Sequence, residues 1–290
     1  MNVARRPEEL DHARRAAAIG TFDGVHLGHR RVIEAARAAG LRTTVVTFDP
    51  HPRRFFGNHV EMLSTTERRL ELLDDVGVED VLLLTFDETV ATLAPEEFAE
   101  SVLRAAGVEV VTAGETFRFG RGRAGDLDLL ARLGLDVRRV PLVDNVSSSH
   151  IRLLLAAGDV RRAADLLGRP AEVEGTVVLG DQRGGTLGFP TANLALPVDL
   201  LVPAFGIYAG AALGHRAAVS IGTNPHYGGT ERRIEAFLLD YEGDLYGSRV
   251  VVELWERLRD EAVFDSEAEL VAAIDDDVAR TRAATRPAPG

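Results

Sequence analysis

The chain has 290 residues, of which 46% are hydrophobic, enough to fill one large core or two smaller ones. Its formal net charge of −12 excludes a general nucleic-acid surface, because such a surface needs clustered positive charge. The chain has no cysteine, which excludes disulfides and thiolate metal sites, and all 33 of its basic residues are arginine, which excludes a P-loop lysine. No apolar run resembles a signal peptide or is long enough to span a membrane, so we expect a cytoplasmic protein without a membrane or nucleic-acid partner.

A glycine-rich turn joins an apolar run at residues 16 to 19 to an amphipathic helix expected over residues 30 to 39. Glycines in such a turn let the backbone approach an anion, and the N-terminus of the helix offers unpaired N–H groups. The sequence therefore predicts a nucleotide-phosphate site in this turn. Its candidate binding residues are Gly20, Phe22, Asp23 and Gly28.

Two histidines of this turn, His26 and His29, are three residues apart, so we expect their side chains to lie on one side of the helix start. Without a cysteine nearby, the pair suits stabilisation of charge at a phosphorus atom better than metal binding. From the spacing alone, a structural role for the pair is an equally good interpretation.

A third histidine follows the next predicted strand, residues 43 to 48, within Asp49-Pro50-His51-Pro52. Because successive parallel strands end at one edge of a sheet, we expect His51 to join the phosphate site. The alternative is a proline-rich loop with an incidental histidine.

The first half of the chain alternates between strands and helices. Helices are expected over residues 64 to 75 and 95 to 106, and strands over 80 to 85, 108 to 113 and 136 to 140. This alternation predicts an α/β domain with a doubly wound parallel sheet.

A loop over residues 114 to 123 interleaves glycine, phenylalanine and arginine. Phe117 and Arg121 are its candidates for holding a flat ring and a phosphate. The alternative is a surface loop that Phe117 and Phe119 anchor in the core.

Serines at residues 147 to 149 begin the next expected helix, where they suit simple caps. Ser148, Ser149 and Arg152 also offer hydroxyl and guanidinium groups to a phosphate, and the two roles are compatible. A further helix over residues 159 to 167 ends at Gly168-Arg169-Pro170. We expect the domain boundary there, which gives domains of residues 1–169 and 170–290.

The second half contains short strand-like runs separated by glycine, proline and asparagine. These runs are residues 173 to 179, 206 to 213, 217 to 221, 234 to 239 and 249 to 254. They predict an antiparallel β-barrel, which a helix over residues 266 to 282 closes.

Two stretches of this half carry candidate chemistry. Residues 187 to 193 place a hydroxyl and an amide beside a glycine, which are oxygen ligands suited to Mg²⁺ with a nucleotide, although a simple turn explains the pattern equally well. Glu235, in an otherwise apolar strand, lies either on the solvent face or in a partly buried position suited to a general base. The candidates of the first stretch are Gly188, Pro190, Thr191 and Asn193.

Seven motifs stand in a fixed order along the chain. They are the turn at residues 19 to 29, TFDPHP at 47 to 52, FRFGRGR at 117 to 123, SSSHIR at 147 to 152, LGFPTAN at 187 to 193, SIGTNP at 220 to 225 and IEAFLLDYEGDLYG at 234 to 247. The first motif resembles that of the nucleotidylyltransferase superfamily. Together the seven resemble the prokaryotic bifunctional riboflavin kinase/FMN adenylyltransferases, over nearly the whole chain.

This resemblance implies two reactions, both of which use ATP, and it implies Mg²⁺ as a cofactor. The C-terminal domain would phosphorylate riboflavin to FMN, and the N-terminal domain would transfer AMP from ATP to FMN, giving FAD and pyrophosphate. Riboflavin, FMN and ATP are thus the expected partners, and weak self-association is expected as well.

The resemblance also implies roles for individual residues. Thr191 and Asn193 would hold Mg²⁺ and ATP, and Glu235 would be the general base. His26 and His29 would stabilise charge at the α-phosphate, with the serines and Arg152 on the phosphates. Phe117 and the loop to residue 123 would border the flavin, with Phe55 and Phe56 as weaker candidates.

The sequence departs from the family pattern where Thr116 replaces an aspartate, where Gly185 replaces an arginine, and at residues 226 and 227. A kinase with a silent adenylyltransferase domain is therefore one alternative function. A nucleotidylyltransferase for another acceptor and a non-catalytic flavin-binding protein are two others.

Overall fold

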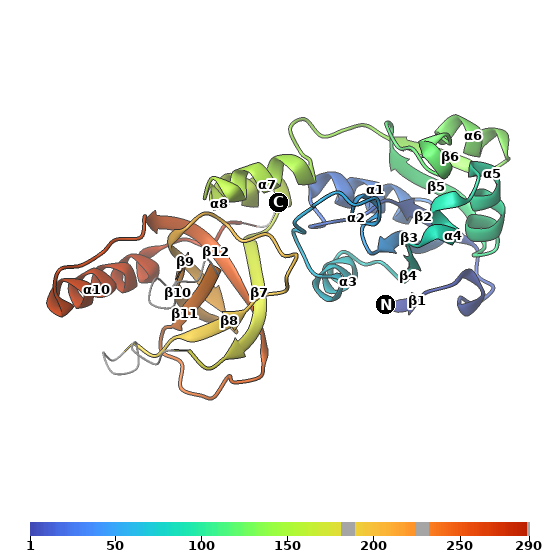
Figure 1. Cartoon of the computed structure of the whole chain (residues 1–290). Helices are drawn as coiled ribbons and strands as arrows, with labels where there is room; N and C mark the ends of the chain where they lie inside the picture. The colour runs from blue at the N-terminus through green and yellow to red at the C-terminus, as the bar shows by residue number, and fades with distance from the viewer. Residues whose placement is uncertain (181–188, 224–231, 289–290) are drawn as a thin grey trace. The chain divides into compact units, whose positions relative to one another are not determined.

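The computed structural model describes residues 1–180, 189–223 and 232–288. The chain divides into two compact units, Met1–Val146 and Ser147–Gly290, and each is described by itself. The first unit contains a sheet with helices around it, and the second contains a barrel (Figure 1). The domain limits expected from the sequence, 1–169 and 170–290, fall later in the chain and stay a prediction.

The first unit is built on six strands in the order β1-β4-β3-β2-β5-β6. Every pairing is parallel, which confirms the predicted doubly wound sheet and places all the carboxyl ends of the strands along one edge. β1 was not predicted, because three residues are too few to show a periodic pattern. The strands are β1 (Asn2–Ala4), β2 (Arg15–Ile19), β3 (Arg42–Asp49), β4 (Asp80–Thr85), β5 (Val108–Gly114) and β6 (Asp136–Val140).

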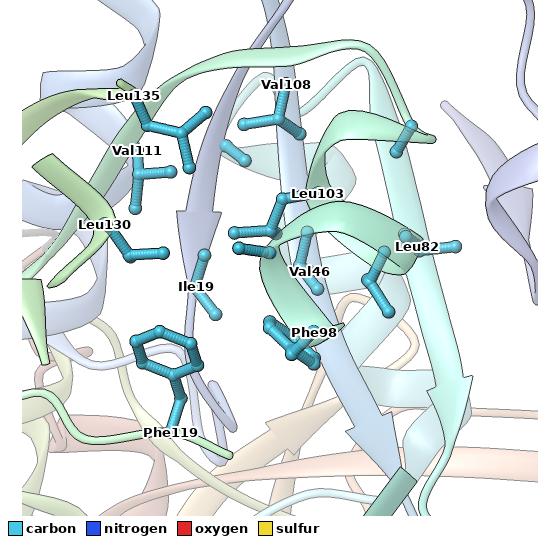
Figure 2. Close-up of a cluster of buried hydrophobic side chains, with 14 of the residues drawn as sticks. Ile19, Val46, Leu82, Phe98, Leu103, Val108, Val111, Phe119, Leu130 and Leu135 are labelled. Atoms are coloured by element: carbon cyan, nitrogen blue, oxygen red, sulfur yellow. The ribbon is translucent and has the colours of Figure 1, made fainter. Parts of the chain in front are cut away.

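Helices cover both faces of this sheet, and alternate residues of β2 show the two faces. Ala17 and Ile19 belong to the buried cluster under α5 and α6, whereas Ala16 and Ala18 belong to the cluster under α1 and α3. Figure 2 shows the first cluster, in which Phe98 lies among side chains from the strands. The helical segments are η1 (Pro7–Glu9), α1 (Leu27–Arg37), α2 (Pro52–Phe55), α3 (Thr66–Asp75), α4 (Glu88–Thr92), α5 (Pro95–Phe98), η2 (Ala99–Arg104), η3 (Arg121–Arg123) and α6 (Leu127–Arg132).

The helix expected over residues 95 to 106 is present over most of that range, but its hydrogen-bonding pattern changes from α-helical to π-helical. It begins as α5 and continues as the wider π-helical turns of η2. The N–H of Ala105 accordingly donates to the carbonyl of Glu100, five residues earlier, at 3.2 Å. This winding still buries Phe98, Val102 and Leu103 in the core.

The second unit contains a closed barrel with the strand order β10-β11-β8-β7-β12-β9, and all its pairings are antiparallel. The predicted barrel is therefore confirmed. β8 was not predicted, because its four residues follow directly on a glycine- and proline-containing turn. The strands are β7 (Ala171–Val178), β8 (Ala192–Ala195), β9 (Gly206–Ala212), β10 (His215–Thr223), β11 (Arg232–Leu238) and β12 (Arg249–Arg259).

Two helices precede the barrel within the second unit, α7 (Ser148–Ala156) and α8 (Val160–Leu167). α8 packs against β7 and β12 and buries Val160, Ala163 and Leu167. Arg161 of α8 also pairs with Glu256 of β12, with 2.6 Å between nitrogen and oxygen. These contacts make α8 part of the barrel unit.

The C-terminal helix α10 (Glu267–Ala283) is held on the barrel largely by arginines. Arg259 of β12 pairs with buried Asp277 at 2.7 Å, and Arg216 of β10 donates to the Thr281 and Ala284 carbonyls at 2.8 and 2.7 Å. The helix predicted over residues 266 to 282 is thus present with Ser266 as its N-cap. In the described ranges of the chain, neither α10 nor any other helix has the length and apolar character needed to cross a membrane.

A buried ion cluster joins the amino ends of β2, β3 and β4. Arg15 and Asp80 are both 0% exposed, with 3.1 Å between Arg15 Nε and an Asp80 oxygen, and Arg42 Nε lies 2.9 Å from the same oxygen. Asp11 accepts hydrogen bonds from both arginines, and the hydrogen bond from Arg15 holds the pKa of the Asp11 carboxyl below its usual value. Arg15 and Arg42 stand side by side on paired strands, and the carboxylates of Asp80 and Asp11 each contact both arginines.

Asp80→Ala should lower the free energy of unfolding of the first unit by about 3 kcal/mol, because the Arg15 charge stays buried but loses the Asp80 carboxylate that compensates it. Urea unfolding followed by far-UV circular dichroism measures this loss. Fluorescence of Trp255, the only tryptophan, reports the second unit and should show an unchanged transition.

The matched control for this prediction is Asp136→Ala. Asp136 forms an exposed pair with Arg138 at 3.7 Å, and such pairs contribute less than about 1 kcal/mol. Equal losses in the two variants would contradict the special contribution of the buried cluster.

Candidate functional site

The loop between β2 and α1, residues 20–26, is the first loop of the sheet edge. Its backbone is unusual, since Phe22 and Val25 have φ values of 50° and 39° and yet carry side chains. Both side chains are buried, at 1% exposure each, so packing holds this strained conformation in place. Gly24 has φ 79°, and a Cβ there would lie 2.8 Å from Leu63, so only glycine fits.

Asp23 and the glycines of the opening motif shape the first loop. The Asp23 carboxylate is fully buried and accepts a hydrogen bond from the N–H of Leu63 at 2.9 Å. Gly20 packs against the Phe22 ring, and a Cβ on Gly28 would lie 3.2 Å from ring atoms of His26. These contacts indicate that Asp23 and the Phe22 ring set the shape of the loop, and contacts of Gly20, Phe22, Asp23 and Gly28 with a nucleotide stay predictions.

The structure brings His26 and His29 together. Their rings stack with 3.6 Å between centroids and 14° between planes, and Phe22 lies 5.1 Å from the His29 ring. His26 is the N-cap of α1, and its Nδ1 accepts from the N–H of His29 at 3.3 Å. An accepting Nδ1 places the ring proton of neutral His26 on Nε2, so that Nε2 can donate to a phosphate oxygen.

His51 lies at the same edge, in the short loop of residues 50–51 between β3 and α2, here called the second loop. It is the N-cap of α2, and its Nδ1 accepts from the N–H of Arg53 at 3.2 Å. Because β2 and β3 are parallel neighbours, the first and second loops leave the sheet side by side. Topology thus brings His51 to the edge that holds His26 and His29.

Arg69 of α3 was not predicted as a site residue. Its side chain links the first loop to the end of β3. It is only 2% exposed and donates to the carbonyl of Thr21 and to the carbonyl of Phe48, each at 3.0 Å. Its spacing to the buried Leu72 and Leu73, three and four residues later, is the sequence signal that would have found it.

An aromatic cluster stands where β3 and β4 end, and it consists of Phe55, Phe56 and Phe86. The ring centroids are 5.2 to 6.0 Å apart and the rings meet at steep angles. Phe56 is 64% exposed and Phe55 is 39% exposed, although both are large apolar side chains. Phe86 was missed in the sequence, and its N–H donates to the Asp49 carbonyl at 3.0 Å, which fixes it beside the second loop.

The loop after β5 is anchored in the core, as the alternative interpretation of its sequence holds. Phe119 is 7% exposed and lies with Ile19 and Phe98 in the buried cluster (Figure 2). The Phe117 ring stacks on it at 5.8 Å and is half-buried. Arg121 is exposed, with its N–H bonded to Leu93, and contacts of Phe117 and Arg121 with a ligand stay predictions.

The predicted phosphate-binding residues of the SSSHIR motif lie on α7, in the second unit. Ser147 is the N-cap and accepts from the N–H of His150 at 3.2 Å. Ser148 and Arg152 are half-buried and Ser149 is exposed. Capping is thus done by Ser147, and phosphate binding by the other residues stays a prediction.

A second candidate site lies on the outer face of the barrel. Ile234 and Ala236 of β11 point into the barrel, so Glu235 between them points outward and is half-buried. Thr191, just before β8, donates from its hydroxyl to Glu235 at 3.3 Å, and Asn193 is the register partner of Glu235. The pairing of β8 with β11 therefore brings together the three residues that the sequence selected.

Neighbouring residues complete this outer face. Phe189 and Phe237 meet edge to face at 5.5 Å, and the Asn193 amide donates to the Thr191 carbonyl at 3.4 Å. A Cβ on Gly180 would lie 2.2 Å from the Asn193 amide nitrogen, so glycine there lets the chain pass close to Asn193. Pro190 is exposed, and the candidate Gly188 lies outside the described residues.

Two family models match the chain in succession. The FAD synthetase model matches residues 8–152, and the riboflavin kinase model matches residues 167–285. The first match contains the loops of the sheet edge, and the second contains Thr191, Asn193 and Glu235. Each candidate site thus lies within its own matched region.

Full-length relatives resemble the chain over nearly all of its residues. The bifunctional riboflavin kinase/FMN adenylyltransferase of Listeria monocytogenes is 34% identical and covers 95% of this chain and 94% of its own, and that of Pseudomonas fluorescens is 36% identical and covers 97% and 96%. A crystal structure named as a macrolide-efflux protein from Streptococcus pneumoniae is 31% identical, covers 97% of this chain and 98% of its own, and has a TM-score of 0.87. The chain therefore belongs to the bifunctional riboflavin kinase/FMN adenylyltransferase family.

Proposed function

We propose that the chain makes FMN from riboflavin and ATP at the barrel site, and FAD from FMN and ATP at the sheet edge of the first unit. The observation that carries this proposal is the convergence of Thr191, Asn193 and Glu235 on one face of the barrel. The names of the relatives and the two matched family models support both activities.

In the kinase reaction, Glu235 is the general base. It accepts the proton of the ribityl 5′-hydroxyl as that oxygen forms a bond to the γ-phosphorus of ATP, and the bond to ADP breaks. The Thr191 hydroxyl, 3.3 Å from the carboxylate, orients it. Half-burial supports this role, because a partly enclosed carboxylate is better oriented than one fully in water.

The oxygen atoms of this site fit Mg²⁺, a hard cation that prefers oxygen ligands and often shares them with substrate phosphates. Within the described ranges of the chain, no group of three or more histidine, aspartate or glutamate residues could hold a metal. Thr191 and Asn193 are the residues proposed to hold Mg²⁺. When bound, the ion neutralises charge on the transferring phosphoryl group.

In adenylyl transfer, an oxygen of the FMN phosphate attacks the α-phosphorus of ATP, and the bond to pyrophosphate breaks. His26 and His29 stabilise the charge that develops on the α-phosphate, together with the N–H groups at the start of α1. The substrate phosphate is itself the nucleophile, so the protein need not form a covalent intermediate. Ser148, Ser149 and Arg152 are proposed to contact the phosphates.

The aromatic cluster of Phe55, Phe56 and Phe86 is proposed to bind the flavin ring of FMN. Its two exposed rings stand beside the second loop, at the sheet edge that holds the histidines. A flat conjugated ring buries such aromatic faces and gains stacking energy. Phe117 remains a further proposed flavin contact.

A cytoplasmic location and weak self-association stay predictions.

The test is to incubate the protein with riboflavin, ATP and Mg²⁺, to start a parallel reaction from FMN, and to separate the flavins by chromatography. FAD in both reactions supports the proposal. FMN that accumulates without FAD would favour a kinase with a silent adenylyltransferase site, for which Thr116 is the specific observation. No turnover in either reaction would favour a binding protein.

Glu235→Gln should reduce riboflavin phosphorylation by about 100-fold or more, because the amide cannot accept the hydroxyl proton. FAD formation from supplied FMN should be unchanged, which the parallel reaction measures. Glu267→Gln, on the exposed first turn of α10, is the matched control and should leave both rates intact. Loss of both activities in Glu235→Gln would contradict independent sites.

His29→Ala should show the reverse pattern. FAD formation should fall by about 100-fold, because a group that stabilises transition-state charge is removed, while riboflavin phosphorylation continues. His12→Ala changes an exposed histidine that precedes β2 and serves as the control. Normal FAD formation by His29→Ala would remove the first loop from the mechanism.

Phe56→Ala should raise the KM for FMN in FAD formation about fivefold, because stacking on one ring contributes about 1 kcal/mol. The KM for ATP should stay the same. Phe205→Ala, which removes a 38% exposed ring from the second unit, provides the comparison. An unchanged KM for FMN would place the flavin away from the aromatic cluster.

A further inference from the structure

Arg69 is an unusual residue for the position it occupies in α3. Its side chain is 2% exposed, and burial lowers the pKa of the guanidinium, although nearby Asp23 and Asp49 act in the opposite direction. Within the described part of the chain, its Nε has no hydrogen-bond partner. Burying a charged group costs free energy, so the contacts of Arg69 must offset that cost.

Those contacts are mainly to main-chain carbonyls at the ends of two strands. Nη1 donates to Thr21, which follows β2, and Nη2 donates to Phe48 near the end of β3, each at 3.0 Å. Nη2 also lies 3.4 Å from the Thr66 hydroxyl. Thr21 belongs to the first loop, and Phe48 is the second-last residue of β3, so one rigid planar group links the first loop to the strand end that the second loop follows.

The segment before Arg69 supports the same loop. The N–H of Leu63 donates to Asp23 at 2.9 Å, and the N–H of Gly24 donates to the Ser64 hydroxyl at 3.3 Å. The first loop is thus fixed from its start to its centre by residues 63–69. This matters because its backbone is strained at Phe22 and Val25 and would relax without support.

We propose that Arg69 is a positioning residue for adenylyl transfer, which sets the spacing between the first and second loops. The inference rests on the proposed function of the first unit. Each loop holds its own part of the reaction, since the first carries His26 and leads into His29 of α1, and the second adjoins the aromatic cluster. A change in their spacing therefore separates the reacting atoms while each substrate still binds.

The geometry also explains why arginine is needed. A guanidinium presents donors in a fixed plane and can reach two carbonyls at once, whereas an ammonium is a single flexible point. Lysine at residue 69 should retain the charge and one carbonyl contact. Methionine should retain most of the packing and lose both contacts.

The experiment compares Arg69→Met and Arg69→Lys with the wild type in FAD formation from FMN and ATP. We expect Arg69→Met to lower kcat about 100-fold with both KM values within about threefold, because positioning is lost and binding is kept. The kcat of Arg69→Lys should be about tenfold higher than that of Arg69→Met. Arg68→Met is the matched control, since Arg68 on the preceding position of α3 pairs with Glu71 at 2.7 Å, and it should behave as wild type.

Riboflavin phosphorylation by the same samples checks that each variant is correctly quantified, because that site lies on the barrel, and far-UV circular dichroism checks that the first unit is folded. A fall in thermal stability with an unchanged kcat would overturn the proposal and make Arg69 a structural residue only, as would equal losses in Arg69→Met and Arg68→Met. If Arg69→Met does not fold, Arg69→Lys decides, and a kcat equal to that of the wild type overturns the proposal. A wild type that forms no FAD would instead refute the proposed adenylyl transfer itself.

Discussion

Buried guanidinium groups hold the ends of the parallel strands, and both edges of the first unit depend on them. Parallel pairing fixes the middle of a sheet but leaves polar groups at the strand ends to find other partners. Arg15 meets this need at the amino edge by joining Asp80, and Arg69 meets it at the carboxyl edge by bonding two carbonyls. In a chain without lysine, arginine is the only cation available for such positions, and its several donors let one buried charge satisfy several acceptors.

Much of the architecture could be predicted from the sequence, because its local patterns agree with its tertiary structure. The strands at Asp80–Thr85 and Asp136–Val140 were predicted at the residues where β4 and β6 occur. Sites whose residues are close in sequence, such as His26 and His29, were also predicted as pairs. The sequence pattern missed two short strands, β1 and β8. It also missed the change from α-helical to π-helical hydrogen bonding in η2, which leaves the buried residues of that helix buried.

The parts of the candidate sites that sequence reasoning could not supply depend on contacts between distant segments. Glu235 could have faced either side, and only the register of β8 against β11 shows that it lies beside Asn193. The spacing of Arg69 to Leu72 and Leu73 indicates that it lies on the buried face of its helix, but nothing local shows that it bonds the carbonyls of Thr21 and Phe48. Phe86 lies thirty residues from Phe56 and joins it only because β3 and β4 are neighbours. Each of these contacts exists only once the strands have paired.

The packing of α8 has a practical consequence for dividing the protein. The change in composition near residue 168 invites a cut there, yet that cut would strip from the barrel a helix whose buried face rests on β7 and β12. The released fragments would each carry an apolar surface, one on the helix and one on the strands, and both would tend to aggregate. A separately expressed barrel should therefore begin ahead of α7, and proteases should cleave the native chain more readily around residues 141 to 147 than around residue 168.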